Sequence, residues 1–290
     1  MKPIQIPESY NYIGAFLTFS CNLKCSYCIN HFEQKLIKKR SISGKDWVNG
    51  LNRIICRDDL PVSLQGGEPS LHPDFFYIIN KMRPELNIDI LTNLQFDVNE
   101  FIKNVDPNRV KRTSPYASIR VSYHPEQMDL EETIKKTWKM LEAGFSIGIW
   151  GVTYPKYEDI ILEAQEKCQK LGIDFRTKEF LGEYNNRLYG NYRYEGACEK
   201  RFRKKVKCKA TEILIDSQGD IFHCHAGLYS GIGKIGSILD PDFQIEDRFR
   251  ECDNFGHCNP CDIKVKTNRF QEYGHTSVEV KFVNNYDEKI

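Results

Sequence analysis

The sequence of 290 residues lacks an excess of charge, a long apolar run and an apolar N-terminal segment. Its 41 basic residues balance 40 acidic ones, and the net charge of +1 argues against a nucleic-acid partner and an acidic solvating protein. The best apolar run, residues 146–153, falls well short of the ~18 residues of a membrane span. Because no signal-peptide core follows Met1, we expect a cytoplasmic protein without a membrane partner.

Cysteine, in contrast, is abundant, with eleven residues in the chain. The number is odd, and a chain of this length does not need disulfide staples, so a disulfide framework explains it poorly. Most of these cysteines fall into two clusters with short spacings. The spacings indicate metal or iron–sulfur ligation.

Apolar runs and helical patterns alternate through the first part of the chain. We expect strands at residues 12–19, 61–65, 88–91, 117–122, 145–152 and 173–180, and helices at 44–56, 72–82, 130–143 and 158–171. This alternation predicts an α/β fold with a parallel sheet and right-handed crossovers. Six units fit a partial (β/α)6 TIM-like barrel better than an open doubly wound sheet. In such barrels the chemistry lies at the carboxyl ends of the strands.

The pattern changes near residue 185, which divides the chain into expected domains at residues 1–185 and 186–290. The second part begins with a polar, tyrosine-rich stretch and a basic run at residues 199–209. Short strands are expected at residues 212–216, 221–223 and 277–283, and Gly219 marks a hairpin between the first two. We therefore expect a small C-terminal domain that contains a β-hairpin and carries the second cysteine cluster.

Cys21, Cys25 and Cys28 form a CxxxCxxC segment directly after the first expected strand. A cubane 4Fe–4S cluster normally takes four thiolates, so three thiolates from one loop leave one iron open to a substrate or cofactor. The alternative is a zinc loop with a remote fourth ligand, although zinc sites more often use CxxC pairs.

This segment, with Tyr27 directly before its last cysteine, resembles the radical S-adenosylmethionine (SAM) superfamily. The run Gly66-Gly67-Glu68-Pro69 after the second strand matches the GGEP motif of that family. The resemblance implies that this motif receives the methionine amino group and that Tyr27 lies against adenine. It also assigns Ser122 to the methionine carboxylate or the ribose, and places Gly151 and Val152 in the stretch that contacts adenine.

The resemblance also implies the chemistry. Cys21, Cys25 and Cys28 hold a 4Fe–4S cluster, and its open iron binds the amino and carboxylate groups of SAM. One electron, from a donor such as flavodoxin or ferredoxin, breaks a carbon–sulfur bond of SAM. The resulting 5′-deoxyadenosyl radical abstracts a hydrogen atom from the substrate. The protein orients SAM, excludes water and directs the radical, while the cofactor carries the difficult step.

A second set of cysteines follows in the C-terminal part. Cys208 and Cys224 flank Gly219 as C-x10-G-x4-C, and Cys258 and Cys261 form a CxxC pair. Four thiols of this kind fit either a zinc ribbon or an iron–sulfur cluster.

The spacing is similar to that of the Twitch auxiliary domain of radical SAM enzymes, a shortened relative of the SPASM domain. This resemblance implies one auxiliary 4Fe–4S cluster held by Cys208, Cys224, Cys258 and Cys261, with Cys252 as the alternative ligand. A fully ligated cluster cannot bind substrate at iron, so we expect it to accept an electron from a substrate radical. Tuning the site and relaying electrons to the first cluster are the alternatives.

Other polar residues are candidates for contact with the substrate. Arg176 and Lys178 share one face of the sixth strand, where alternate residues point into a barrel, and His124 follows the fourth strand. These three are our candidate catalytic residues, and exposure at the surface is the alternative reading for the first two. Cys198 or Cys252 could return a hydrogen atom, as a free cysteine does in some radical epimerases. The basic run is either a solvated surface or a sign of an anionic substrate, such as a nucleotide-linked small molecule.

Three functions remain open at this point. The leading hypothesis is the two-electron oxidation of a small polar substrate, such as a sugar or cyclitol, because the chain is similar to Twitch-bearing aminocyclitol dehydrogenases. The second is modification of a peptide by epimerisation or crosslinking, which we favour less because we see no room for a leader-binding winged-helix segment. The third is a non-enzymatic zinc protein that uses both cysteine sets structurally.

Overall fold

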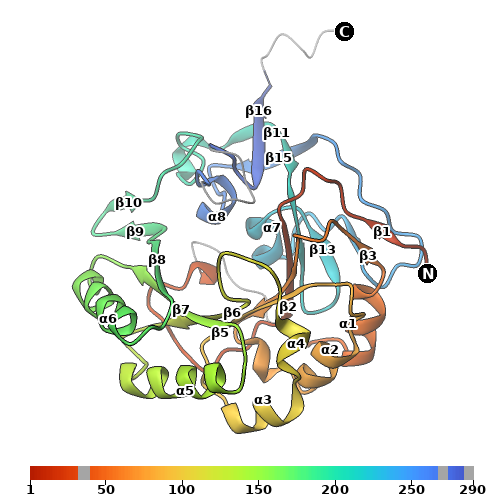
Figure 1. Ribbon diagram of the computed structural model, residues 1–290. Helices are drawn as coiled ribbons and strands as arrows, with labels where there is room; N and C mark the ends of the chain where they lie inside the picture. Colours follow the sequence, from red (N-terminus) through yellow and green to blue (C-terminus); the bar gives the residue numbers. More distant parts are fainter. Residues whose placement is uncertain (32–39, 267–273, 284–290) are drawn as a thin grey trace.

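The computed structural model describes residues 1–31, 40–266 and 274–283. Its centre is a nine-stranded sheet in the order β14-β13-β12-β2-β4-β5-β6-β7-β8 (Figure 1). Six of these strands run parallel as neighbours: β2 (Tyr12–Thr18), β4 (Val62–Gly66), β5 (Ile88–Thr92), β6 (Ile119–Tyr123), β7 (Ile147–Thr153) and β8 (Phe175–Glu179). The predicted α/β fold, a partial TIM-like barrel, is therefore confirmed.

Helices follow the parallel strands and cover one face of the sheet (Figure 1). They are α1 (Gly44–Leu51), α2 (Phe75–Lys81), α3 (Val98–Asn104), α4 (Pro107–Val110), α5 (Leu130–Glu142) and α6 (Glu158–Lys170). The expected helix over residues 44–56 is too long, because residues 54–55 instead form β3 (Ile54–Ile55), which pairs with β1 (Ile4–Gln5). Helices α3 and α4 were not predicted, because they are too short to show a clear helical period, although Asp97 and Asp106 cap them.

Side chains of the parallel strands point alternately to the apolar core between the sheet and the outer helices and to the polar interior of the barrel. In β6, Ile119 and Val121 are buried in the core that includes residues of the outer helices. Arg120 and Ser122 lie on the other face and are only partly buried. Successive side chains of a strand point to opposite faces, so this pattern turns polar groups toward the inside of the barrel.

The C-terminal part adds strands to the same sheet. β12 (Glu212–Ile215) pairs in parallel with β2, and β13 (Asp220–Phe222) and β14 (Gly236–Ser237) continue the sheet beyond it. The expected hairpin is present, and Gly219 takes a φ of +78° in its turn. A domain boundary near residue 185 stays a prediction, since strands from both sides of it share the sheet.

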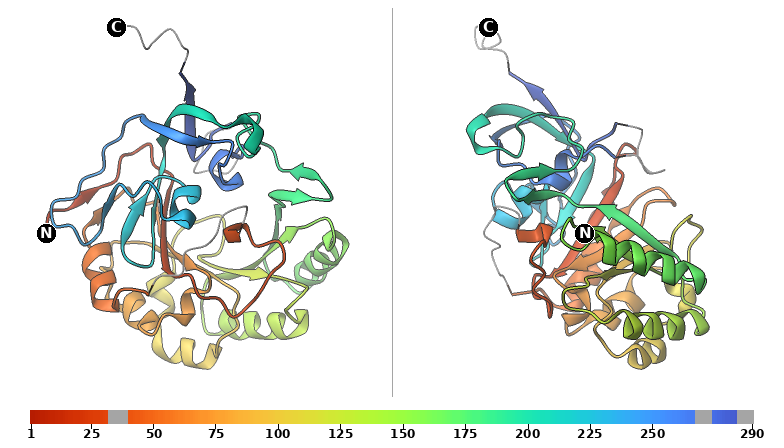
Figure 2. Two further views of the ribbon diagram at one scale, coloured as in Figure 1. Left: turned by 180° about the vertical axis from the view of Figure 1, so that it is seen from behind. Right: turned by 90° about the vertical axis from the view of Figure 1, so that its left-hand side faces the viewer.

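The rest of the C-terminal part forms a small sheet of its own, ordered β15-β11-β16. Its members are β11 (Lys204–Ala210), β15 (Arg250–Phe255) and β16 (Val278–Phe282), the last confirming the strand expected near residue 277. Around it lie a hairpin of β9 (Gly182–Tyr184) and β10 (Arg187–Tyr189), and the helices α7 (His225–Ser230) and α8 (Pro260–Ile263). Figure 2 shows this sheet at the opposite end of the molecule from α3 and α5. No helix in the described ranges is long and apolar enough to cross a membrane.

Candidate active site

The three N-terminal cysteines lie on the loop that leaves β2 at its carboxyl end. Burial raises the pKa of the Cys25 thiol to about 12, and the nearby charges of Cys28 and Cys21 add to the effect. The three thiols lie within eight residues of one another on a single loop. Iron ligation requires deprotonated thiols and offsets their repulsion. The loop therefore fits the three-thiolate cluster that its spacing predicts.

Glu126 and Gln127, which follow β6, hold this loop in place. The backbone N–H and the hydroxyl of Ser26 donate to the Glu126 carboxylate at 2.6 and 2.9 Å. The backbone N–H of Lys24 donates to Gln127 Oε1 at 2.7 Å. The sequence analysis did not identify Glu126 or Gln127, and only their position directly after the fourth barrel strand could have pointed to them.

The Gly66-Gly67-Glu68-Pro69 motif runs alongside the chain that leads into the cysteine loop. The N–H of Gly67 donates to the Thr18 carbonyl at 2.9 Å, and that of Glu68 to the Ser20 carbonyl at 2.8 Å. A Cβ at Gly66 would lie 2.1 Å from the Thr18 oxygen, and one at Gly67 would lie 2.2 Å from the Ser20 oxygen. The two glycines are therefore required by close backbone approach rather than by a simple turn.

Glu68 places a buried carboxylate beside the cysteine loop. It accepts hydrogen bonds from the hydroxyls of Ser70 and Thr92 at 2.7 and 2.8 Å, and from the N–H of Asn93 at 2.7 Å. Burial raises the pKa of Glu68, and these donors oppose the shift. The Asn93 side chain in turn donates to Asn22 Oδ1 at 2.7 Å, which joins the motif to the loop. A fixed carboxylate in this place suits an ammonium group.

An aromatic wall stands on the other side of the loop. The ring of Tyr27 stacks on that of Tyr154, with centroids 4.7 Å apart, and its hydroxyl lies 3.0 Å from His124 Nδ1. Burial lowers the pKa of His124 to about 4, so the ring is neutral at pH 7. The structure thus places His124 against Tyr27. Tyr154, which directly follows β7, was not identified from the sequence.

The remaining residues expected to contact SAM lie on β6, β7 and the turn after β4. Ser122 is partly buried on the interior face of β6, and Val152 pairs with Lys178 across β7 and β8. A Cβ at Gly151 would lie 2.8 Å from Ile161 on α6, so this glycine allows the helix to pack closely. Pro69 is buried at the start of a 3₁₀ turn over Pro69–Leu71. Their roles toward SAM stay predictions.

The barrel interior contains a cavity of about 760 Å³. Ser63, Asp89 and Arg120 line it from β4, β5 and β6, and Lys264 and Lys266 line it from the C-terminal part. A volume of this size accommodates a small organic molecule. Because these residues come from both halves of the sequence, no local motif could reveal the cavity.

Five basic side chains line the cavity against two carboxylates, Asp89 and Glu179, and the buried Asp89 is already neutralised. Asp89 is bound by Arg112 through two hydrogen bonds of 2.7 and 2.9 Å, and by Arg120 at 3.0 Å. The predicted catalytic residue Arg176 lines the same cavity, but its guanidinium binds Asp174 at 3.0 Å. These ion pairs fix the arginines in place.

Lys178, also predicted to be catalytic, differs from the arginines. Its side chain is open to the cavity although many protein atoms surround it. The surrounding protein atoms, together with the charges of Arg120 and Lys264, lower the pKa of Lys178 to about 7. Within the described ranges no carboxylate lies at ion-pair distance from it. A lysine with a lowered pKa is a candidate proton acceptor.

The second cysteine set meets beside the small C-terminal sheet. Cys208, Cys224, Cys252 and Cys258 all belong to, or pack against, one apolar cluster that includes Val206. Cys198 is buried in the same cluster and donates from its thiol to the Cys258 carbonyl at 3.1 Å. Cys261 is not among the members of this cluster. The sulfur-rich, apolar surroundings fit an auxiliary iron–sulfur cluster.

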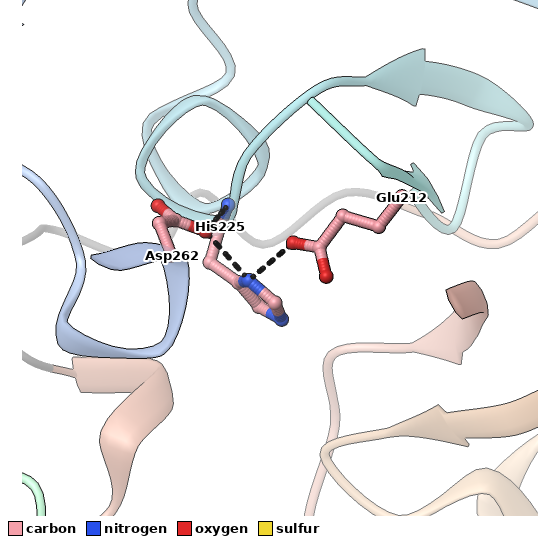
Figure 3. Close-up of side chains that lie close together, drawn as sticks. All are labelled: Glu212, His225 and Asp262. Carbon is pink, nitrogen blue, oxygen red and sulfur yellow. Dashed lines mark hydrogen bonds and ion pairs between the residues drawn. The ribbon is translucent and has the colours of Figure 1, made fainter. Parts of the chain in front are cut away.

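A buried charge network adjoins this set. His225 follows Cys224, and its Nδ1 lies 2.8 Å from Asp262 and 3.3 Å from Glu212 (Figure 3). Although burial opposes the change, these two carboxylates raise the pKa of His225 well above its usual value. Asp262 also accepts from the backbone N–H groups of His225 and Ala226 at 2.8 and 3.2 Å. The network joins β12, α7 and α8.

The family of the chain follows from comparison with known proteins. The model of the radical SAM superfamily matches residues 16–175, which include the cysteine loop, the GGEP motif and all of β4 to β7. This chain belongs to the radical SAM superfamily. Like other radical SAM enzymes, it uses a 4Fe–4S cluster and S-adenosylmethionine. The zinc-protein hypothesis is thereby excluded for the first cysteine set.

Curated relatives of this radical SAM enzyme include two proteins named GTP 3′,8-cyclase. The one from Sulfurovum sp. strain NBC37-1 is 23% identical over 220 residues, 73% of this chain and 66% of the relative. The one from Mannheimia succiniciproducens is 27% identical over 148 residues, 49% of this chain and 43% of the relative. The chain thus spans less than two thirds of the length of either relative.

Solved radical SAM structures share the fold. Streptococcus suis SuiB bound to S-adenosylmethionine aligns with a TM-score of 0.51 and 18% identity, covering 83% of this chain and 64% of SuiB. The structure titled native anSMEcpe with bound AdoMet and Kp18Cys peptide aligns with a TM-score of 0.53 and 14% identity, covering 82% and 78%. At such identities the likeness shows the fold and carries nothing about the substrate.

Proposed function

We propose that this radical SAM enzyme oxidises a small, anionic, sugar-like or cyclitol-like alcohol bound in the barrel cavity. The observation that carries the proposal is the positively charged cavity with the low-pKa amine of Lys178 open to it. Arg120 and Lys264 supply further positive charge near that amine. Such a lining favours a substrate with phosphate or carboxylate groups.

Residues at the carboxyl ends of the strands would hold SAM. Cys21, Cys25 and Cys28 would ligate the cluster, Glu68 would receive the amino group, and Tyr27 would lie against adenine. When bound, the cluster and SAM supply the radical that takes a hydrogen atom from the substrate. The chain itself orients these groups through the rigid contacts of Glu68 and the cysteine loop, and excludes water from them.

An oxidation of this kind balances as follows. The carbinol carbon would lose a hydrogen atom to the radical and its hydroxyl would lose a proton. The remaining unpaired electron would need an acceptor, which an auxiliary cluster held by the second cysteine set would supply, and a carbonyl group would remain. We assign the proton to the neutral amine of Lys178. Arg176 binds Asp174 and would contact the substrate through its remaining N–H groups. We assign His124 a positioning role, because its Nδ1 is hydrogen-bonded to the Tyr27 hydroxyl.

A second candidate is rearrangement of a nucleotide without net oxidation. It is favoured by the curated relatives named GTP 3′,8-cyclase together with the same positive cavity. In that case an electron and a proton would return to the product radical, so that product and substrate would have equal mass.

Anaerobic assay of the reconstituted enzyme with SAM and dithionite tests both candidates. Sugar phosphates, nucleotide-linked sugars, GTP and neutral cyclitols would be compared for their stimulation of 5′-deoxyadenosine formation. We expect anionic compounds to stimulate, with a product lighter by two hydrogen atoms, whereas a product of unchanged mass selects the rearrangement. Lys178→Gln should abolish product formation, and the exposed Lys205→Gln serves as the matched control. Stimulation by neutral compounds or peptides alone would overturn the proposal.

A further inference from the structure

Six cysteines lie in the C-terminal part. Five of them are candidates for the four corners of an auxiliary cubane, because the thiol of the sixth, Cys198, donates to the Cys258 carbonyl at 3.1 Å. Spacing favours Cys208, Cys224, Cys258 and Cys261, since the last two form a CxxC pair. Sequence order alone cannot decide between Cys252 and Cys261, because both lie within a few residues of Cys258. The arrangement of the strands and of α8 decides it.

Cys208 and Cys252 are brought together by the pairing of β11 with β15. In this antiparallel pair Cys208 lies opposite Arg250, and Cys252 lies opposite Val206. Cys208 and Cys252 are thus diagonal neighbours on one face of the sheet, within reach of each other.

Cys224 and Cys258 face the same place from two loops. Cys224 caps α7, and its sulfur accepts from the Gly227 N–H at 3.3 Å. Cys258 is buried, and its backbone N–H donates to the Ala197 carbonyl at 2.9 Å. Both cysteines belong to, or pack against, the same apolar cluster as Cys252 and Cys208. All three therefore share one locality with Cys208.

Cys261 lies apart from these four cysteines. Although it is half-buried, it is not among the described residues that belong to, or pack against, their apolar cluster. Asn259 directs this turn toward the barrel, because its Oδ1 accepts from the Cys261 N–H at 3.0 Å and its Nδ2 donates to the Ile29 carbonyl at 3.3 Å.

The charge network of Figure 3 keeps α8 in this orientation. The carboxylate of Asp262 binds the first N–H groups of α7 and the ring of His225, so α8 cannot rotate without breaking these contacts. A turn of α8 that moved Cys261 toward Cys208 would leave the buried Asp262 carboxylate without its donors, which is costly.

We propose that Cys208, Cys224, Cys252 and Cys258 ligate the auxiliary 4Fe–4S cluster and that the Cys261 thiol stays outside it, on the barrel side of α8. The surrounding side chains are apolar and include Val206, Phe255 and Val280. This setting limits solvent access to the cluster. The inference rests on the auxiliary cluster and not on the proposed substrate.

The test compares Cys252→Ala with Cys261→Ala in the full-length chain that also carries Cys21→Ala, Cys25→Ala and Cys28→Ala. This background removes the first cluster, so all remaining iron reports on the second. After anaerobic reconstitution, the background protein should bind about four irons and four sulfides per chain. We expect Cys261→Ala to keep this content and the electron paramagnetic resonance spectrum of the reduced cluster, and Cys252→Ala to lose most of both.

A second measurement separates loss of a ligand from loss of the fold. Cys252→Ala alone, with the first cysteine loop intact, should retain about four irons and cleave SAM, which shows that the barrel is folded. Loss of the second cluster in Cys261→Ala with retention in Cys252→Ala would overturn the inference, as would zinc in place of iron. Either result leaves the wild-type enzyme's cleavage of SAM intact, so failure here is distinguishable from failure of the proposed function.

Discussion

Replacing Gly67 by alanine tests whether close backbone contact between the GGEP motif and the cysteine loop sets the geometry of SAM cleavage. The new Cβ would lie 2.2 Å from the Ser20 carbonyl oxygen and 2.7 Å from that of Phe19. Favourable contacts of this kind lie near ~3.5 Å, so one segment must move by about 1 Å. Both neighbours are backbone atoms, so no side-chain rotation relieves the clash.

The cost should fall on the site more than on the fold. Overpacking of this kind costs about 1–3 kcal/mol, which is below the about 5–15 kcal/mol that stabilises a typical domain. The variant should therefore fold and bind iron, because its cysteines are unchanged. A displacement of about 1 Å at a reacting centre lowers rates by about 100-fold. We expect a loss of that order in 5′-deoxyadenosine formation with saturating dithionite.

The control is Gly172→Ala at the end of α6. Gly172 has a φ of +77° and no atom within 4 Å of an added Cβ, so this variant suffers backbone strain without a clash. It should lose about 1 kcal/mol of stability and keep its rate of SAM cleavage. If Gly67→Ala cleaves SAM like the wild type, or if Gly172→Ala loses as much activity at equal stability, the reasoning is refuted.

Other substitutions address separate parts of the site. Glu68→Gln removes the charge and keeps the shape, so the affinity for SAM measured by equilibrium dialysis should fall about tenfold or more at unchanged iron content; unchanged affinity would exclude contact with the amino group. Lys264→Gln removes a positive charge near Lys178 and should raise the pKa of that amine above about 7. NMR titration of 13C-methylated lysines measures this pKa, and an unchanged value would contradict the electrostatic account. Tyr27→Phe keeps the stacked ring but loses the bond to His124, and should weaken SAM binding less than Tyr27→Leu; equal losses would argue against stacking.

The sequence predicted those parts of the site that depend on local spacing. Cys21, Cys25 and Cys28 lie within eight residues, and the GGEP motif is a single run. Each motif can therefore be recognised without knowledge of the fold. Strand and helix periodicity then placed both at the carboxyl ends of barrel strands. What these patterns did not show is why Gly67 is a glycine, since the Ser20 carbonyl that it touches lies on a different strand–loop connection.

Contacts between segments far apart in the sequence could not be predicted from hydrophobic periodicity. Glu126 holds the cysteine loop from 100 residues away, and nothing about a Pro-Glu-Gln run marks it for that task. The pairing of β12 with β2 joins strands about 200 residues apart, and it depends on the barrel leaving one edge open. The choice between Cys252 and Cys261 has the same origin, because it follows from the register of β11 with β15 and not from spacing.

These distant contacts make the two cysteine sets mechanically dependent on each other. Asn259, beside the second set, donates to the carbonyl of Ile29, the residue after Cys28. The hydroxyl of Tyr229 on α7 donates to Asn30 Oδ1 at 2.6 Å, and Asn30 Nδ2 donates to the Gly66 carbonyl at 3.2 Å. A continuous line of hydrogen bonds therefore runs from α7 to the SAM-binding motif. Because its members are buried or half-buried, a shift in the C-terminal part must either break a bond or move the cysteine loop, so assembly of the second site should favour the geometry of the first.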